Sequence, residues 1–244
     1  MTLQPSHKRV VVWGAADQAR VNQHILEASG CEVLAYVDDT PGRAPTFESV
    51  PLLSGWNGFT GWVAGHHGAD LGFVVAIGNP YGHVRCRLHD RLVAVGLTPI
   101  SFSDSSALIC RTATLGAGLQ VMPQVLVHNA ASIGRQCILN TRALVEHDCV
   151  LEDGVEIGPG AVLCGRVFVG RHTWIGAGAT VRPRVKIGRN TIIGAGAVVV
   201  NDIPEGVVAV GVPARPISNK TTPSATALAG AHESASRADV IIES

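Results

Sequence analysis

The sequence predicts a fold in two parts, a small parallel α/β domain followed by a parallel β-helix. Strand-like and helix-like segments alternate near the start, and from residue 109 onward an aliphatic side chain returns at every sixth position. The chain has 28 glycines but only 5% aromatic residues, which suits a fold that turns often and packs small side chains. We expect domains at residues 1–105 and 106–217, and a flexible or loosely helical tail at 218–244.

In the first part, apolar segments at 8–14, 32–39 and 71–79 are predicted strands, and segments at 17–29 and 81–95 are predicted helices. This alternation predicts a small Rossmann-like parallel sheet, with its ligand at the carboxyl ends of the strands. The turn after the first strand lacks the GxGxxG pattern, so a dinucleotide is not expected there.

The second part contains a strict hexapeptide repeat. Every sixth residue is Ile, Leu or Val, and a fixed short period is typical of a solenoid. The sixteen anchors are Ile109, Leu115, Val121, Val127, Ile133, Leu139, Val145, Leu151, Ile157, Leu163, Val169, Ile175, Val181, Ile187, Ile193 and Val199.

A period of six fits neither an α-helix nor an alternating strand. Three hexapeptides can instead form one triangular coil, whose short strands stack on the coil below at about 4.8 Å and whose interior holds the anchors. Glycine directly follows seven of the anchors, where a bend or a close backbone approach leaves no room for a side chain. The anchors are therefore core residues, and any chemistry belongs to outward and corner positions.

His147 is such an outward residue, two positions after the anchor Val145. A histidine titrates near neutral pH, so it suits a general base that takes a proton from an attacking amine or hydroxyl. Asp148 or Glu146 could hold its other ring nitrogen. Gly165 lies eighteen residues later, one full coil on, at the height where its N–H could support an oxyanion.

Residues 106–217 resemble the hexapeptide-repeat acyltransferases, whose fold is a left-handed parallel β-helix. The segment ending in Gly211-Val212-Pro213-Ala214 is similar to the closing GxPA signature of that family. Asn140-Thr141, followed by Val145-Glu146-His147-Asp148-Cys149, resembles the NT and hxHDC motifs of its amino-sugar N-acetyltransferases and sialic acid O-acetyltransferases. The resemblance implies a homotrimer with active sites between neighbouring helices.

By this resemblance, His147 is the general base and Asp148 its carboxylate partner. Acetyl-CoA is the implied cosubstrate, and no metal is needed. The implied contacts of acetyl-CoA are Asn140, Gly165, Ala177 and Ala195.

The first domain is similar to the nucleotide-binding domain of the nucleotide-amino-sugar acetyltransferases. That domain binds its nucleotide through its first turn, an acidic pair that ends the second strand, and a turn with the sequence AIGN. The acidic pair could hydrogen-bond a uracil or ribose, or could be ordinary turn aspartates. The implied substrate-binding residues are Gly14, Ala15, Ala16, Asp38, Asp39, Ala76, Ile77, Gly78 and Asn79.

Two features depart from the family's pattern. Glu156 stands nine residues after His147, where the family often has a second histidine near the thioester. A carboxylate there could indicate altered acetyl-CoA contacts, another acyl donor or an inactive site. Asp17 and Gln18 occupy first-turn positions where the family has a glycine and a histidine, and an acid there would repel a diphosphate. This turn leaves a non-nucleotide ligand open.

Composition excludes other classes of partner. Basic and acidic residues balance at 19 each, so neither nucleic acid nor a membrane surface is expected to bind. The six cysteines lack CxxC spacing and no secretory leader is evident, which favours a reducing cytoplasm.

A γ-class carbonic anhydrase would need three converging histidines, and only His147 and His172 are plausible. No metal is expected.

The predicted function is therefore an acetyl-CoA-dependent N-acetyltransferase that acts by direct transfer on an amino-sugar, most simply a nucleotide-linked one. An O-acetyltransferase acting on a sialic acid or another sugar hydroxyl is the enzymatic alternative, because the same base serves both nucleophiles. A non-catalytic trimeric β-helix platform is the alternative from another class.

Overall fold

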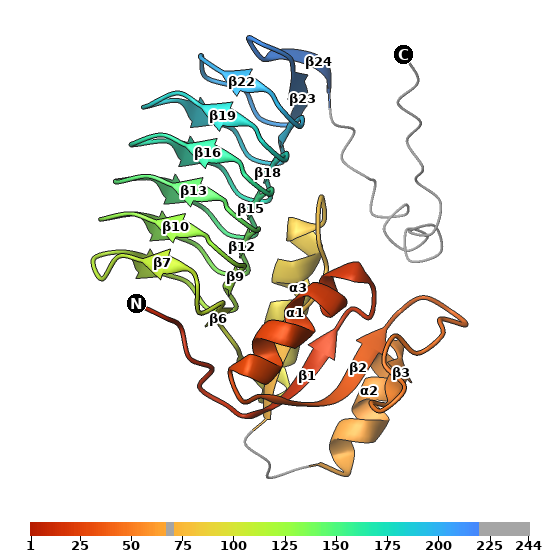
Figure 1. The fold of residues 1–244 in the computed structure, drawn as a ribbon. Helices are drawn as coiled ribbons and strands as arrows, with labels where there is room; N and C mark the ends of the chain where they lie inside the picture. Colours follow the sequence, from red (N-terminus) through yellow and green to blue (C-terminus); the bar gives the residue numbers. More distant parts are fainter. Residues whose placement is uncertain (67–70, 220–244) are drawn as a thin grey trace.

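A computed structural model describes residues 1–66 and 71–219, and shows an α/β domain beside the lower coils of a parallel β-helix (Figure 1). The predicted tail lies almost entirely outside the described residues. No helix within the described ranges is long and apolar enough to cross a membrane.

The α/β domain contains the expected parallel sheet, which has five strands in the order β3-β2-β1-β4-β5. Its strands are β1 (Arg9–Trp13), β2 (Glu32–Asp38), β3 (Leu52–Ser54), β4 (Leu71–Val75) and β5 (Thr98–Pro99). Helix α1 (Asp17–Ala28) packs on one side, and α2 (Gly55–Ala64) and α3 (Gly82–Ala94) pack on the other. Helices α1 and α3 correspond to the two predicted helices, whereas β3, α2 and β5 were not predicted.

The β-helix has three sheets, here called faces 1, 2 and 3. Face 1 comprises β6 (Phe102–Ser103), β9 (Gln120–Val121), β12 (Ile138–Leu139), β15 (Glu156–Ile157), β18 (Trp174–Ile175), β21 (Ile192–Ile193), β23 (Val207–Val210) and β24 (Arg215–Asn219). Face 2 comprises β7 (Leu108–Ile109), β10 (Leu126–Val127), β13 (Leu144–Val145), β16 (Val162–Leu163), β19 (Thr180–Val181) and β22 (Val198–Val199). Face 3 comprises β8 (Thr114–Leu115), β11 (Ser132–Ile133), β14 (Val150–Leu151), β17 (Phe168–Val169) and β20 (Lys186–Ile187).

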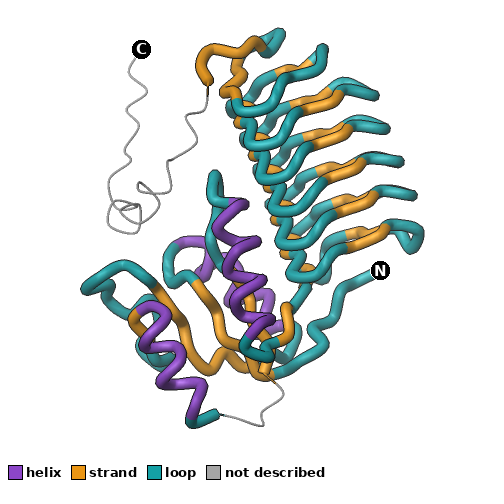
Figure 2. Tube along the Cα trace, turned by 180° about the vertical axis from the view of Figure 1, so that it is seen from behind, coloured by secondary structure: helices purple, strands orange, loops and turns teal. Residues whose placement is uncertain are grey.

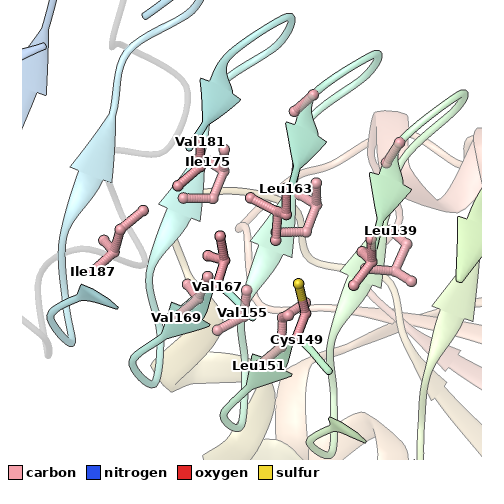
Figure 3. Close-up of a cluster of buried hydrophobic side chains, with 14 of the residues drawn as sticks. Leu139, Cys149, Leu151, Val155, Leu163, Val167, Val169, Ile175, Val181 and Ile187 are labelled. Atoms are coloured by element: carbon pink, nitrogen blue, oxygen red, sulfur yellow. The ribbon is translucent and has the colours of Figure 1, made fainter. Parts of the chain in front are cut away.

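Stacked strands pair in parallel with a register of eighteen residues, for example Val127 with Val145 and Val145 with Leu163. One coil is therefore three hexapeptides, as the period predicts. The anchors fill the interior (Figure 3), where all are buried except the partly buried Leu115. The preceding residue of each strand points outward, which follows from the alternation of side chains along a strand.

The coil turns at three corners, named after the faces they join. In one coil, corner 1–2 is residues 140–143, corner 2–3 is 146–149, and corner 3–1 is 152–155. Every sixth residue from Gly118 to Gly196 has a positive φ, between 54° and 74°. Most of these residues are not glycine, although this conformation costs an L-residue about 1–2 kcal/mol. Cross-coil hydrogen bonds, such as Asp148 N–H to Asn129 C=O at 3.0 Å, hold them there.

The α/β domain docks on face 1 and corner 3–1, with α3 running alongside the coils (Figures 1 and 2). The outward residues Phe102, Gln120, Ile138 and Glu156 of face 1 are buried beneath it. The contact is close enough that a Cβ on Gly82 would lie 2.1 Å from the Gly154 carbonyl oxygen. The two parts therefore share one continuous interface.

A buried histidine in this interface makes stability depend on pH. His89 of α3 places Nδ1 3.0 Å from the side-chain amide of Gln136. Burial, with help from the Arg135 charge, lowers the pKa of His89 below the ordinary 6.5. The unfolded chain therefore takes up a proton that the folded chain does not, and the free energy of unfolding should fall as pH drops below about 6.5.

Urea unfolding at pH 7.5 and 5.5 measures this slope, and His89→Gln should make it shallower. His172, whose pKa burial also lowers, should retain part of the slope in the variant. A slope that is the same in parent and variant would show that His89 does not contribute.

Candidate active site

His147 lies in corner 2–3, directly after β13. Its Nδ1 is 2.8 Å from Asp148 Oδ2, and its side chain is 50% exposed. Glu146, the other candidate partner, instead accepts the backbone N–H of His147 at 3.1 Å. The sequence alone did not decide which of the two acids holds the Nδ1 of His147, and the structure favours Asp148.

Asp148 is held as a carboxylate. The hydrogen bond from His147, together with Arg166 Nε at 3.4 Å, holds the pKa of Asp148 below its usual value. A carboxylate on Nδ1 favours the tautomer with the proton on Nδ1. The lone pair of Nε2 is then available to accept a proton.

Gly165 lies one coil above His147, as the eighteen-residue spacing predicts. A Cβ on Gly165 would be 2.5 Å from His147 Nε2, so glycine leaves the space that the imidazole occupies. Among the described residues, the Gly165 N–H has no hydrogen-bond acceptor. It is therefore free to donate to a ligand.

Replacing Gly165 with alanine should displace the ring of His147 and lower kcat about 10- to 100-fold, since misplacement by about 1 Å has effects of this size. Thermal unfolding should change little, because the ring is half exposed. Gly61→Ala is the control, since a Cβ at that position would have no atom within 4 Å. Steady-state kinetics that match the parent would exclude this packing role.

The other predicted acetyl-CoA residues lie at corner 1–2. Ala177 and Ala195 are exposed and stand one coil apart in the same column. Their N–H groups have no acceptor within the described part of the chain. Asn140, lower on this corner, donates Nδ2 to Glu156 Oε1 at 3.2 Å and to the Ile157 carbonyl at 3.1 Å.

The predicted substrate residues gather around a pocket of about 430 Å³ at the carboxyl ends of β1, β2 and β4. Of these nine residues, Ala15 does not line it. Ala15 is buried, and its N–H donates to Asp38 at 2.9 Å. The lining residues that had been predicted are Gly14, Ala16, Asp38, Asp39, Ala76, Ile77, Gly78 and Asn79.

The acidic pair shapes this pocket. Asp38 accepts the N–H groups of Ala15 and Thr40, both at 2.9 Å, and pairs with Arg43 at 2.9 Å. Burial opposes ionisation of Asp38, but these hydrogen bonds and Arg43 bring its pKa below the usual value. Asp39 accepts the indole N–H of Trp13 at 3.0 Å. Asp38 therefore holds the loops of the pocket together.

Gly14 must be glycine, because its φ is 101° and a Cβ would lie 2.3 Å from the Ala76 carbonyl oxygen. Gln18, which replaces the family's histidine, reaches Asn22 at 3.1 Å and Gln120 of face 1 at 3.4 Å. Asp17 lines the pocket.

Sequence reasoning missed the basic residues of the pocket. Arg43 and Arg87 line it together with His83 and Tyr81. His83 and Arg87 project from the first and second turns of α3, and Arg43 comes from the loop after β2. The available signal for Arg87 was a basic residue in the second turn of a predicted helix, whereas Arg43 lies in a segment without hydrophobic periodicity.

A second cavity of about 380 Å³ lies between α3 and corner 3–1. Its charges are largely paired with one another, as Arg135 contacts Asp90 and lies 3.0 Å from Asp153. In the described ranges, no group of three or more His, Cys, Asp or Glu side chains is arranged to hold a metal ion.

Within one chain, the structure does not bring all the predicted site residues together. The pocket is lined only by residues of the α/β domain. His147 and Gly165 lie on corner 2–3, and Asn140, Ala177 and Ala195 lie on corner 1–2. These two corners are the two edges of face 2.

Comparison with known proteins is consistent with this architecture. Residues 166–201 match the family described as bacterial transferase hexapeptide (six repeats). A histidine-to-alanine mutant of GDP-perosamine N-acetyltransferase from Caulobacter crescentus, in complex with CoA and GDP-perosamine, is 34% identical, with a TM-score of 0.80 over 88% of this chain and 100% of that one. The acetyltransferase domain of PglB from Neisseria gonorrhoeae, with acetyl coenzyme A, is 28% identical, with a TM-score of 0.77 over 87% and 100%.

A curated relative, GDP-perosamine N-acetyltransferase from Escherichia coli, is 32% identical over 103 residues. That alignment spans 42% of this chain and 46% of the relative. The chain belongs to the hexapeptide-repeat acyltransferases with a left-handed β-helix. Within that class it belongs to the group that carries an α/β domain before the β-helix, like the Caulobacter enzyme.

Proposed function

We propose that this protein transfers the acetyl group of acetyl-CoA to the amine of a nucleotide-linked amino-sugar. The observation that carries the proposal is the pairing of His147 with Asp148 beneath Gly165. The pocket of the α/β domain supplies the acceptor site, so residues 1–105 bind substrate and 106–217 carry the transfer chemistry. All six cysteines are free thiols, which suits a cytoplasmic location.

His147 Nε2 takes a proton from the acceptor's neutral amine as its nitrogen attacks the thioester carbonyl carbon. The new C–N bond forms, and negative charge develops on the carbonyl oxygen, to which the Gly165 N–H donates. The intermediate then collapses, the C–S bond breaks, and CoA leaves as the thiol after receiving the proton held by His147. Asp148 stabilises the imidazolium in between. No acyl-enzyme is needed.

The pocket suits the anionic part of a sugar nucleotide. The N-termini of α1 and α3 both face it, and the positive end of each helix dipole favours negative charge. Arg43 and Arg87 add positive charge, which offsets Asp17. Three solved structures of the Caulobacter enzyme are described with CoA and GDP-perosamine bound, which makes GDP-perosamine the first acceptor to test.

Corner 1–2 suits acetyl-CoA. Ala177 and Ala195 leave a smooth path beside the coils, and their free N–H groups can donate to the amide carbonyls of the pantetheine arm. Asn140 lies at the end of this path nearest the pocket. Acetyl-CoA would then run along the β-helix toward the acceptor.

A homotrimer brings the separated residues together. The outward column of face 2 is mostly apolar, and in the described part of the chain its residues are partly or well exposed, with Leu108 at 57%. The lower coils of face 1 are covered by the α/β domain, and face 3 is more polar. The face 2 column is Leu108, Leu126, Leu144, Val162, Thr180 and Val198.

When three copies of face 2 surround a threefold axis, corner 2–3 of one chain lies beside corner 1–2 of the next. His147 of one chain then meets the acetyl-CoA path of its neighbour. In that neighbour, Asn140 on the acetyl-CoA path is linked to the acceptor pocket of the same chain, because Glu156 accepts hydrogen bonds from both Asn140 and Asn79.

The test is release of CoA thiol from acetyl-CoA with a panel of GDP-, UDP- and dTDP-linked amino-sugars, free sialic acids and unlinked amino-sugars. Turnover with a nucleotide amino-sugar, with acetyl found on nitrogen, is the expected result. Turnover only with hydroxyl acceptors would show an O-acetyltransferase. The absence of turnover with every acceptor would favour the non-catalytic platform.

A further inference from the structure

A buried ion pair joins the acceptor pocket to the β-helix. Arg85 of α3 is fully buried, and Glu156, the outward residue of β15, is 3% exposed. Arg85 Nη1 lies 3.2 Å from Glu156 Oε2. Glu156 therefore points into the domain interface and not toward solvent.

Arg85 uses its guanidinium to hold backbone on both sides of that interface. On the pocket side, Nη1 donates to the Ile77 carbonyl at 2.9 Å. On the β-helix side, Nε donates to the Gln136 carbonyl at 3.0 Å, and Nη2 donates to the Gly154 carbonyl at 2.9 Å. One side chain thus ties the turn at residues 76–79 to corner 3–1.

Glu156 makes the corresponding connection with its other oxygen. Oε1 accepts Asn79 Nδ2 at 3.1 Å and Asn140 Nδ2 at 3.2 Å. Asn79 lines the acceptor pocket, and Asn140 lies on the acetyl-CoA path. A single carboxylate therefore fixes one residue from each proposed substrate site.

Helix α1 and the end of β4 are tied to the same column of face 1 as Glu156. Gln120, Ile138 and Glu156 are stacked outward residues of three successive coils. The side chain of Gln120 accepts a hydrogen bond from Asn22 Nδ2 at 2.8 Å and donates one to the Val75 carbonyl at 2.7 Å. Helix α1 and the segment after β4 line the pocket through Gln18 and Ala76, so face 1 holds two elements that adjoin it.

Holding the domains together does not by itself require these charges. Burying an ion pair costs desolvation, and apolar residues of similar size often stabilise an interface equally well. Hydrogen bonds to a carboxylate and a guanidinium are directional, however, so they fix positions as apolar contacts do not. The network therefore suits a role in geometry.

We propose that Glu156 and Arg85 are positioning residues, which hold the turn at 76–79 and Asn140 so that the acceptor amine meets the thioester. This inference rests on the proposed function for its kinetic part. It also gives Glu156 a role that needs neither a different acyl donor nor an inactive site.

The test compares Glu156→Gln with the double variant Arg85→Met/Glu156→Met. Glu156→Gln should raise the KM for the nucleotide amino-sugar at least 10-fold and leave the KM for acetyl-CoA within about 3-fold of the parent, because the amide cannot accept from all three donors. The double variant removes both charges but also the donor to the Ile77, Gln136 and Gly154 carbonyls, so it should remain less stable than the parent and keep the high acceptor KM. Recovery of both stability and acceptor KM would overturn the proposal.

Amide hydrogen exchange of the segment 75–81 gives a readout that does not depend on turnover. Both variants should exchange this segment at least 10-fold faster than the parent. Arg135→Met is the matched control, since it removes another link between α3 and corner 3–1 without touching the pocket, and it should leave this exchange unchanged. Parent-like exchange in Glu156→Gln would overturn the inference even if acetyl transfer is observed, and faster exchange would support it even if no acceptor is found.

Discussion

Replacing His147 with alanine is expected to lower kcat for acetyl transfer by about 10²–10⁴-fold, the usual contribution of a general base. The amine could still bind and lie near the thioester, but no group would take its proton as it attacks. Because the His147 side chain is half exposed, the free energy of unfolding should change by no more than about 0.5 kcal/mol. CoA thiol release with GDP-perosamine and a thermal unfolding curve measure the two effects.

His128 offers a matched control for this variant. It lies near His147, with a ring-centroid separation of 6.4 Å, but among the described residues it has no carboxylate partner of the kind that Asp148 provides. His128→Ala should keep kcat within about 3-fold of the parent, as expected for a residue without a proton to transfer. Equal thiol release by His147→Ala and the parent would eliminate His147 as the base.

The β-helix could be predicted almost residue by residue because its fold is specified by a short repeating pattern of neighbouring residues. Each coil repeats the same three short strands, so an aliphatic residue at every sixth position is enough to identify the interior. The same regularity placed Gly165 above His147 from a spacing of eighteen. Register in a solenoid follows from sequence distance alone, and that is why this part of the site was predictable.

The α/β domain was less predictable because its elements are short and its segments differ. Helix α2 has two glycines in its interior, Gly58 and Gly61, which weaken a helical pattern. The three-residue strand β3 is too short to show alternation. Arg43 lies in a loop that is positioned by its ion pair with Asp38. No local sequence pattern reveals this contact.

The departures at Gln18 and Glu156 needed tertiary structure to be understood. Both residues contact groups about 70 to 100 positions away in the chain, as in the Arg85–Glu156 pair and the Gln18–Gln120 contact. The sequence shows that each residue differs from the family's pattern, but it does not show which distant residue each one contacts. The structure shows that Glu156 faces the domain interface.

A mixture of two inactive variants is expected to recover activity if the active site lies between chains. His147→Ala lacks the base but keeps its pocket. Gly78→Phe keeps the base but fills the acceptor pocket, and the nearest atom to a Cβ there is 3.7 Å away, so the new side chain has room without a clash. In trimers assembled at random from equal amounts, about a quarter of the sites combine an intact pocket with an intact neighbouring His147.

Coexpression of the two variants with different affinity tags, followed by purification through both tags, isolates the mixed trimers. Thiol release should return to a substantial fraction of the parental rate, whereas each variant alone should remain nearly inactive. Gly61→Phe, on the exposed side of α2, is the control for a bulky substitution outside the pocket. If purified mixed trimers stay inactive, the pocket and the histidine of one chain must serve the same site. The separation of His147 from the pocket would then have to be closed by movement of the α/β domain, which the buried Arg85–Glu156 network opposes.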